Sequence, residues 1–350
     1  MQSGPHLVGS VGTSFALIAS YQRAARRDAY DAGQPKPLPY TAHEHRLFAV
    51  RSRCARSLNG SKAGLLLWLT CVLLKDHTRQ RIGPMETLRD KVSVITGAAS
   101  GIGRAVARAL ADQGGHIVAV DVDNDGIQAL AGDLSDRGTA VLSLRADVSD
   151  PEAFEGIRSA ALQRFGRVDI VVNNVGVLTN GLPQDIPVNE WQRILDINLM
   201  SVVRSNAAFL PLLLDQGSGH LVNTASFAGL FTYSYDRLPY AATKAAIVQI
   251  SEGLAIYLRP KNIGVTLLCP GPVLTNIAAA VPTFGGGAPL RTPGEQFELL
   301  DPAPIGELVA DAILRNRFFV PTHPHVVEEL GRRVEDWDAY IDYQISREPL

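Results

Sequence analysis

The chain has 350 residues, of which 46% are hydrophobic and 19% are charged, and its net charge is -2. This length allows one large domain or two small ones, and the composition is that of an ordinary soluble globular protein. Three cysteines without a CxxC spacing exclude a disulfide framework and fit a reducing compartment, so we expect a cytoplasmic protein.

The first 84 residues differ in charge from the rest of the chain. They carry 12 basic and 4 acidic residues, whereas the rest carries 21 basic and 31 acidic residues. Their one apolar run, 63–74, is too short for a membrane span, which needs about 20 residues. Three interpretations stay open: a disordered basic extension, a targeting or membrane-surface segment, or a stretch outside the native protein. We favour the last, with translation beginning at or near Met85.

From Met85 onward, strand and helix patterns alternate with short connections. Apolar and β-branched runs predict seven strands, at Lys91–Thr96, His116–Val122, Ala140–Val148, Val168–Asn174, His220–Ser226, Ile263–Cys269 and Arg317–Thr322. Helices are expected at Gly101–Gly114, Asn124–Arg137, Pro151–Phe165, about 189–214 and about 240–258, with a polar helical tail at the end. This alternation predicts a single α/β domain over 85–350: a Rossmann-like, doubly wound, seven-stranded parallel sheet with helices on both faces.

The segment TGAASGIG joins the first predicted strand to the first predicted helix. Its glycines at 97, 101 and 103 let the backbone turn tightly and let a pyrophosphate approach the helix N-terminus. Because a strand precedes the turn and a helix follows it, we interpret it as a dinucleotide site. Asp121 ends the second strand, where a carboxylate binds ribose hydroxyls and repels a 2′-phosphate. NAD is therefore expected in preference to NADP.

The segment YAATK places Tyr240 and Lys244 on one face of a helix, one turn apart. A phenol titrates near ~10, and a nearby cation stabilises its phenolate form. Ser226 closes the fifth strand 14 residues before Tyr240, and Asn198 lies on the long helix. Taken singly, these residues have structural explanations: a surface pair, a strand end and a helix cap. Taken together, they indicate an acid–base site.

At this point the sequence resembles the short-chain dehydrogenase/reductase family. The likeness covers nearly all of 85–350, with TGxxxGIG, an Asp after the second strand, Asp-Val, NN-x-G, Asn, Ser, YxxxK and PG-x-V-x-T in family order. Val175 departs from the usual Ala of NNAG, which adds two methyl groups and removes no polar group. The resemblance implies an NAD(P)-dependent oxidoreductase that interconverts a secondary alcohol and its ketone.

The resemblance also implies the roles of the site residues. Tyr240 exchanges the hydroxyl proton of the substrate, Lys244 holds the nicotinamide ribose and lowers the Tyr240 pKa, and Ser226 binds the substrate oxygen. Asn198 anchors a water that relays the proton. The other implied cofactor contacts are Gly97, Ser100, Gly101, Ile102, Gly103 and Asp121; Asp147 and Val148 beside the adenine; Asn173 and Gly176 beside the sugar; and Pro270, Gly271, Val273 and Thr275 at the nicotinamide.

A lid over the substrate is expected at about 275–303, where Gly285–Gly287 and several prolines argue against one rigid element. Its apolar lining would come from Ile277, Val281, Phe284 and Leu290, facing Phe231, Tyr233, Tyr235 and Leu238. The alternative is a surface loop with ordinary hydrophobic anchors. A real lining predicts a bulky, apolar substrate. No metal site is expected, and His323 and His325 are interpreted as solvated loop histidines.

Two other functions stay open: a catalytically silent NAD-binding, redox-sensing module, and a membrane-associated reductase that uses 63–74 as an anchor. We expect a small-molecule alcohol or ketone as partner, and neither a nucleic acid nor a membrane. The resemblance implies a homodimer or homotetramer through the two long helices. The apolar spacing of Ile247, Ile250, Leu254 and Leu258 allows such an interface, but it equally describes a core face.

Overall fold

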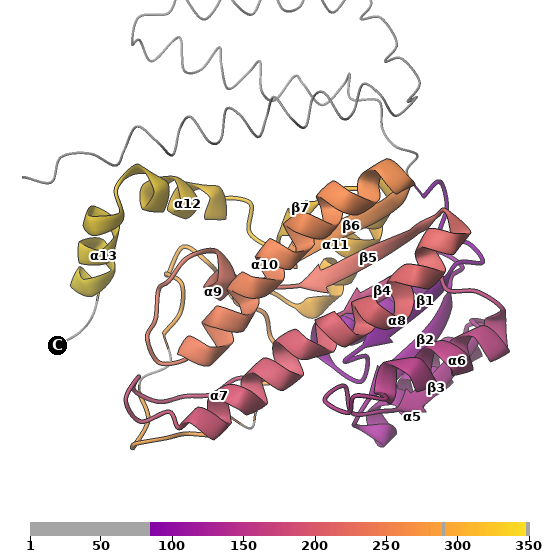
Figure 1. Cartoon of the computed structure of the whole chain (residues 1–350), viewed down its shortest axis with the longest axis horizontal. Helices are drawn as coiled ribbons and strands as arrows, with labels where there is room; N and C mark the ends of the chain where they lie inside the picture. The colour runs from indigo at the N-terminus through magenta and orange to yellow at the C-terminus, as the bar shows by residue number, and fades with distance from the viewer. Residues whose placement is uncertain (1–84, 280, 289–290, 348–350) are drawn as a thin grey trace, which may run out of the picture. The chain divides into compact units, whose positions relative to one another are not determined.

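The computed structural model describes residues 85–279, 281–288 and 291–347. The extension 1–84, its apolar run and Leu290 lie outside the described residues. A seven-stranded sheet forms the centre, in the order β3-β2-β1-β4-β5-β6-β7 (Figure 1). Its strands are β1 Val92–Thr96, β2 His116–Asp121, β3 Val141–Arg145, β4 Ile170–Asn173, β5 Gly219–Thr224, β6 Ile263–Cys269 and β7 Phe319–Pro321. Every pairing is parallel, which confirms the predicted doubly wound fold.

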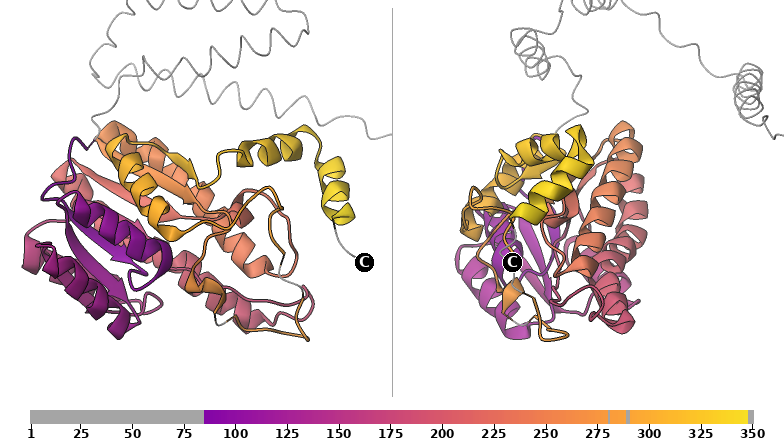
Figure 2. Two further views of the ribbon diagram at one scale, coloured as in Figure 1. Left: turned by 180° about the vertical axis from the view of Figure 1, so that it is seen from behind. Right: turned by 90° about the vertical axis from the view of Figure 1, so that its left-hand side faces the viewer.

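Helices cover both faces of the sheet (Figure 2). One face carries α4 Gly101–Asp112, α5 Asn124–Asp136 and α11 Pro302–Leu314, whose buried residues form one apolar cluster with the strands. The other carries α6 Ala153–Phe165, α8 Ser201–Gln216 and α10 Leu238–Leu258, which form a second cluster. Since both faces are covered, β1, β4, β5 and β6 are buried at every position, as their apolar sequences predict. The structure adds α11 and the short α9, Phe227–Leu230, to the predicted helices.

The helix predicted at about 189–214 forms one continuous helical stretch, but its hydrogen-bonding pattern changes along the chain. It begins as α7 Val188–Ile194, changes to a π-helix, η2 Leu195–Met200, and continues as α8. By length and composition, Val188–Gln216 could cross a membrane. However, α8 packs on β4, β5 and α6, which makes it a helix of the core. The π-helical turn contains Asn198, and single π-turns in α-helices are frequent at functional sites.

Two helices, α12 Val326–Glu335 and α13 Trp337–Ser346, follow one another at the C-terminal end and meet at a sharp bend (Figure 1). Val326 and Tyr340 join an apolar cluster with Phe227 of α9. The Tyr340 hydroxyl donates to the carbonyl O of Thr232 at 3.2 Å. This pair of helices therefore packs against the wall, the stretch between Ser226 and Tyr240 that was expected to face the lid.

Candidate active site

The N-terminus of α4 follows the glycine turn and is open to an anion. Its N-cap, Ser100, makes no side-chain capping hydrogen bond, and the first turn has no acidic residue. In α5, by contrast, the carboxylate of Asp123 accepts from the N–H of Gly126 at 3.0 Å. Because the first N–H groups of a helix have no partner within the helix, the α4 end offers donors and a positive dipole end to a phosphate.

The turn itself requires glycine. Gly97 and Gly101 have φ of 68° and 52°, in the left-handed region. A Cβ on Gly103 would lie 2.0 Å from the carbonyl O of Gly97, which leaves no room for a side chain. A Cβ on Gly101 would lie 2.9 Å from a methyl of Thr275, so the loop after β6 lies against this turn. Ile102 is buried in the core and anchors the helix start.

Asp121 ends β2 beside the turn. Its carboxylate accepts from the N–H of Ala99 at 3.0 Å and from the N–H of Asp123 at 3.1 Å. These bonds orient the carboxylate and leave it lone pairs for ribose hydroxyls. On the neighbouring strand, Arg145 donates to the carbonyl O of Val122 at 3.3 Å. The sequence interpretation missed this cation, because only strand pairing brings Arg145 opposite Asp121.

Asp147 and Val148 follow β3. The carboxylate of Asp147 accepts from the N–H and the hydroxyl of Ser149, at 2.9 and 2.8 Å. These bonds lower the pKa of Asp147, so it is ionised at neutral pH. Val148 is buried among the residues of α6 and β2. The pair thus forms a fixed corner at the carboxyl end of the sheet.

The segment NN-x-G braces the end of β4. Asn173 donates to Asn223 at 2.9 Å, which donates to Ser251 of α10 at 3.0 Å. Asn174, which sequence reasoning did not single out, takes its N–H to Thr96 at 3.1 Å and accepts from Thr224. The side chain of Val175, where the family pattern has Ala, packs against the core without displacing this network. This network fixes the end of β4 to β1, β5 and α10.

Asn198 is fully buried and bound to the chain beyond β4. Its amide accepts from the N–H of Val177 at 2.8 Å and donates to the carbonyl O of Val177 at 3.0 Å. It also donates to the hydroxyl of Thr243 at 3.3 Å. The π-turn therefore holds Asn198 between the loop after β4 and α10. Its partner on α10, Thr243, directly precedes Lys244.

Tyr240, Ser226 and Lys244 converge between β5 and the start of α10. Ser226 caps α9 through a bond from the N–H of Ala228 at 3.2 Å. The ammonium of Lys244 lies 5.6 Å from the centre of the Tyr240 ring. It donates to the carbonyl O of Thr224 at 2.8 Å, its one hydrogen bond among the described residues. Two of its three N–H donors therefore stay available to a ribose.

Burial sets the titration of these groups. It raises the pKa of Tyr240, although the hydrogen bond with Ser226 and the charge of Arg237 lower it. Burial lowers the pKa of Lys244 to about 8. At neutral pH, Tyr240 is therefore a phenol and Lys244 is mainly an ammonium. Arg237 is a second cation near the phenol, and sequence reasoning missed it.

The loop after β6 carries Pro270, Gly271, Val273 and Thr275. Its backbone bonds to the N–H of Phe227, to the hydroxyl of Thr322 and to Leu300 on the returning chain. His323 lies behind it, buried to 4% exposure, with its ring nitrogens near the Thr322 hydroxyl at 3.0 Å and the Glu298 carbonyl O at 2.9 Å. The interpretation of His323 as a solvated loop residue is therefore wrong. Its ring packs against Phe227 and Phe297, and sequence alone did not show this pairing.

Among its described residues, the predicted lid is irregular between the short turn η4, Asn276–Ala278, and the start of α11 at Pro302. Ile277, Val281 and Tyr233, three of the expected lining residues, pack with Leu178 against Tyr240. Other expected lining residues lie elsewhere. Phe231 is in the core cluster with Phe227, and Tyr235 is 36% exposed.

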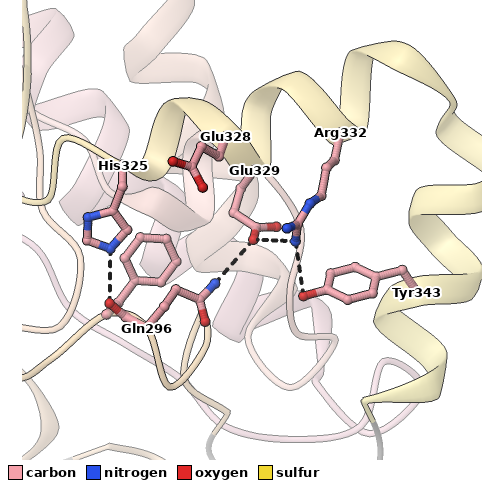
Figure 3. A pocket seen from close by; sticks show the side chains of 7 residues that line it. Gln296, His325, Glu328, Glu329, Arg332 and Tyr343 are labelled. Carbon is pink, nitrogen blue, oxygen red and sulfur yellow. Dashed lines mark hydrogen bonds and ion pairs between the residues drawn. The ribbon is translucent and has the colours of Figure 1, made fainter.

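A polar pocket lies between the lid end and helices α12 and α13, and none of the predicted catalytic or cofactor-binding residues lines it (Figure 3). Glu329 accepts from Gln296 at 3.1 Å and from Arg332 at 3.0 Å. His325 bonds to the carbonyl O of Gln296 at 2.9 Å. These contacts fasten the trailing end of the lid to α12.

The geometry fits a dinucleotide. The uncapped α4, the oriented Asp121 and the donors of Lys244 all lie at the carboxyl ends of β1, β2 and β5, the edge where open α/β sheets bind ligands. Gly176 lies close to the ammonium, with a Cβ position 3.2 Å from Lys244 Nζ. Among the described residues, no group of three or more His, Cys, Asp and Glu side chains could hold a metal ion.

The chain is similar to several known oxidoreductases. The short chain dehydrogenase family model matches residues 91–284. An uncharacterized oxidoreductase of Staphylococcus aureus strain N315 is 35% identical over 250 residues, 71% of this chain and 100% of that protein. A short chain dehydrogenase/reductase from Burkholderia phymatum in complex with NAD has a TM-score of 0.65 and 32% identity, covering 76% of this chain and 98% of that one. A 3-ketoacyl-ACP reductase from Sinorhizobium meliloti 1021 has a TM-score of 0.60 and 28% identity, covering 66% and 97%.

Proposed function

Because the chain belongs to the short-chain dehydrogenase/reductase family of NAD(P)-using oxidoreductases, we propose that it interconverts a secondary alcohol and its ketone, with NAD as the preferred cofactor. The observation that carries this proposal is the convergence of Ser226, Tyr240 and Lys244 next to an uncapped helix N-terminus. The alternative function, a catalytically silent NAD-binding module, does not require a buried phenol beside two cations. Because the burial of such groups lowers the stability of the fold, their presence together favours a catalytic role.

In this proposal, Tyr240 moves the proton. Its raised pKa keeps it protonated at neutral pH, so it donates to the oxygen of a ketone and accepts from an alcohol at higher pH. Ser226 donates to the same substrate oxygen and orients it. Asn198, bound on both sides to Val177, holds the position from which a water returns the proton to Tyr240 through Lys244.

NAD, when bound, supplies or accepts the hydride. The pyrophosphate would lie at Gly97, Ser100, Gly101, Ile102 and Gly103; the adenosine at Asp121, Asp147 and Val148; and the nicotinamide ribose at Lys244, near Asn173 and Gly176. Pro270, Gly271, Val273 and Thr275 would border the nicotinamide. Asp121 favours NAD because its carboxylate repels a 2′-phosphate. A structural neighbour that binds NAD supports this choice.

The substrate side favours an apolar alcohol or ketone. Leu178, Tyr233, Ile277 and Val281 surround the Tyr240 phenol and offer no charge to a polar substrate. A neighbour named as a 3-ketoacyl-ACP reductase supports a ketone within an apolar chain as one substrate shape. Steroid, aryl and alicyclic alcohols fit the same lining.

Purified protein tests the function directly. Alicyclic, aryl and steroid secondary alcohols are offered with NAD, and the matching ketones and a 3-ketoacyl thioester with NADH, while cofactor absorbance is followed. Turnover of at least one apolar pair supports the proposal. Tight NADH binding without turnover of any compound would favour the silent module.

For assembly, we propose a homodimer or homotetramer through α8 and α10, on a face other than the predicted one. Ile247 and Leu258 are buried in the core of the chain itself. The outward apolar residues are Val203, Ile256 and Tyr257, at 39%, 79% and 51% exposure. Light scattering coupled to gel filtration checks this: a monomer, or an oligomer that survives Ile256→Arg, contradicts it.

A further inference from the structure

An ion pair lies in the wall between Ser226 and Tyr240. Arg237 is the N-cap residue of α10 and places its guanidinium on the carboxylate of Asp236, with Nε and a terminal nitrogen donating at 2.5 and 2.8 Å. Asp236 is 1% exposed and also accepts from the hydroxyl of Ser234. Such a buried, bidentate ion pair holds the guanidinium in one position.

This pair also holds the lid. The guanidinium of Arg237 donates to the carbonyl O of Arg291 at 2.9 Å, and the N–H of Arg291 donates to Asp236 at 3.3 Å. On the other side, the carbonyl O of Asp236 accepts from the N–H of Gly181 at 2.9 Å. The ion pair and the main chain of Asp236 therefore join three segments around the substrate site: the β4 loop, the wall and the lid.

The same guanidinium contacts a neighbour of the acid–base residue. Its carbon lies 5.9 Å from the centre of the Tyr233 ring, and Tyr233 packs against Tyr240. A cation held at this place stabilises negative charge on the Tyr240 oxygen, and the low-dielectric surroundings strengthen the effect.

We propose that Arg237 is a positioning residue that couples closure of the lid to proton transfer at Tyr240. The inference rests on the proposed function. With the lid closed, the bonds to Arg291 and Asp236 place the guanidinium beside the phenol. When the lid segment leaves, Arg237 loses one of its acceptors, and the phenolate loses part of its stabilisation.

The charged and titratable groups around Tyr240 come from several elements. Lys244 lies on its own helix, Tyr233 and Asp236 lie in the wall, and Cys269 on β6 faces Lys244. The lid presents apolar Val281 and the charged Arg291, whose guanidinium carbon lies 5.6 Å from the centre of the Tyr235 ring, and the β4 loop presents apolar Leu178. The charge of Arg237 lowers the pKa of Tyr240, against the rise caused by burial. Removal of that charge should therefore raise it.

The opposite edge of the lid offers a matched control. Asn180 bonds to the lid at four places: its main chain to Pro282 and Phe284, each at 2.9 Å, and its side chain to Ala288 at 2.9 and 3.2 Å. Asn180→Ala removes the two side-chain bonds and no charge. It therefore loosens the Ala288 edge of the lid and leaves the bonds of Arg291 to Arg237 and Asp236 in place, so the field at Tyr240 does not change.

The experiment compares the full chain with Arg237→Lys, with Asn180→Ala and with the double variant Asp236→Asn/Arg237→Gln. The double variant removes both charges together, so that no unpaired charge is buried if Arg237→Gln alone does not fold. Hydrogen exchange of the lid amides needs no substrate. We expect faster exchange than in the wild type near Ala288 in Asn180→Ala and near Arg291 in the double variant. Unchanged exchange near Arg291 in the double variant would show that the ion pair of Asp236 and Arg237 does not hold the lid.

The pH profile of kcat for alcohol oxidation tests the coupling. The double variant should raise the apparent pKa of this profile by about one unit. At a fixed pH below that pKa, kcat should then be about tenfold lower than in the wild type. Arg237→Lys keeps the charge and should stay near the wild-type profile. Asn180→Ala should raise KM and leave the profile unchanged. A wild-type profile in the double variant, with turnover intact, overturns the coupling; absence of turnover in every protein, wild type included, would instead contradict the proposed function.

Discussion

Gly176 shows how closely the chain surrounds the Lys244 ammonium. A Cβ at this position would lie 3.2 Å from Lys244 Nζ, closer than an ordinary contact. Because the end of a lysine side chain moves easily, we expect Gly176→Ala to displace the ammonium rather than to unfold the protein. Turnover should fall by about tenfold or more, up to ~10²-fold, since small misplacements of reacting groups are costly.

The control for this prediction is on α5, on the opposite face of the sheet from α10. Gly132→Ala places its Cβ where no atom outside its own helix backbone lies within 4 Å. Alanine is also the better helix former, so stability should rise by roughly 0.5–1 kcal/mol with turnover unchanged. The steady-state rates of the two variants are compared. Full activity in Gly176→Ala would show that the ammonium does not need its present place.

Asp121 sets the cofactor preference in this account. Asp121→Ser combined with Val122→Arg removes the repulsion of a 2′-phosphate and adds a cation beside Arg145. The ratio of kcat/KM for NAD to that for NADP should shift toward NADP by about tenfold or more, because a full charge is removed next to the phosphate. A wild-type enzyme that already prefers NADP contradicts the assignment and would give Arg145 the larger role.

At this scale, sequence motifs predicted the residues whose function depends on local spacing. Tyr240 and Lys244 share a helix face, and the glycine turn follows its strand directly. Arg145, Asn180 and Arg237 were missed, because their partners come from strand pairing or from loops that meet only in the fold. No local period indicates such contacts.

At the scale of elements, strands were predicted within a few residues, since a buried parallel strand has an apolar, β-branched sequence. The π-turn at Leu195–Met200 was not predicted. Its amphipathic pattern continues those of α7 and α8, and only the bonds of Asn198 to Val177 explain why the helix widens there. The burial of His323 was equally non-local, because Phe297 of the lid covers it.

The pairing of β5 with β6 makes a prediction about acid stability. His220 is buried and bonds to the hydroxyl of Thr266 at 2.8 Å. Burial and, to a lesser extent, the charge of Arg259 lower its pKa to about 3. Below pH ~6.5 the unfolded chain binds a proton at this histidine that the folded chain does not, so its contribution to stability is lost as pH falls.

From pH 6.5 to pH 5, His220 should therefore cost about 2 kcal/mol of unfolding free energy. His220→Gln keeps a hydrogen-bonding side chain and removes this titration. Urea unfolding at both pH values measures the difference. The wild type should lose more stability than the variant on acidification, and equal losses would show that His220 does not carry the effect.

At the scale of the whole molecule, and within the part of the chain that the structure describes, residues from Met85 onward form the sheet and the four apolar clusters. Leu88 is buried at 2% exposure and Met85 packs against the same cluster. We therefore expect a protein of residues 85–350 to fold, bind NAD and retain full turnover. A protein that begins at Lys91 lacks Leu88 and should lose roughly 2–5 kcal/mol of stability.

Thermal unfolding and cofactor titration distinguish these two shortened proteins from the full chain. Aggregation or inactivity of 85–350 would mean that the extension takes part in folding or assembly. If the protein that begins at Lys91 is as stable as the protein of residues 85–350, Leu88 contributes little to the core.

The most direct test of the central claim is the turnover of Tyr240→Phe on an alcohol that the wild type oxidises. The substitution removes the one hydroxyl proposed to move the proton and leaves the glycine turn, Asp121 and Lys244 in place. The account predicts a loss of ~10²–10⁴-fold in kcat, with NADH affinity, measured by fluorescence titration, near the wild-type value. A variant that retains more than about a tenth of wild-type turnover would contradict the role of Tyr240 and, with it, the proposed mechanism.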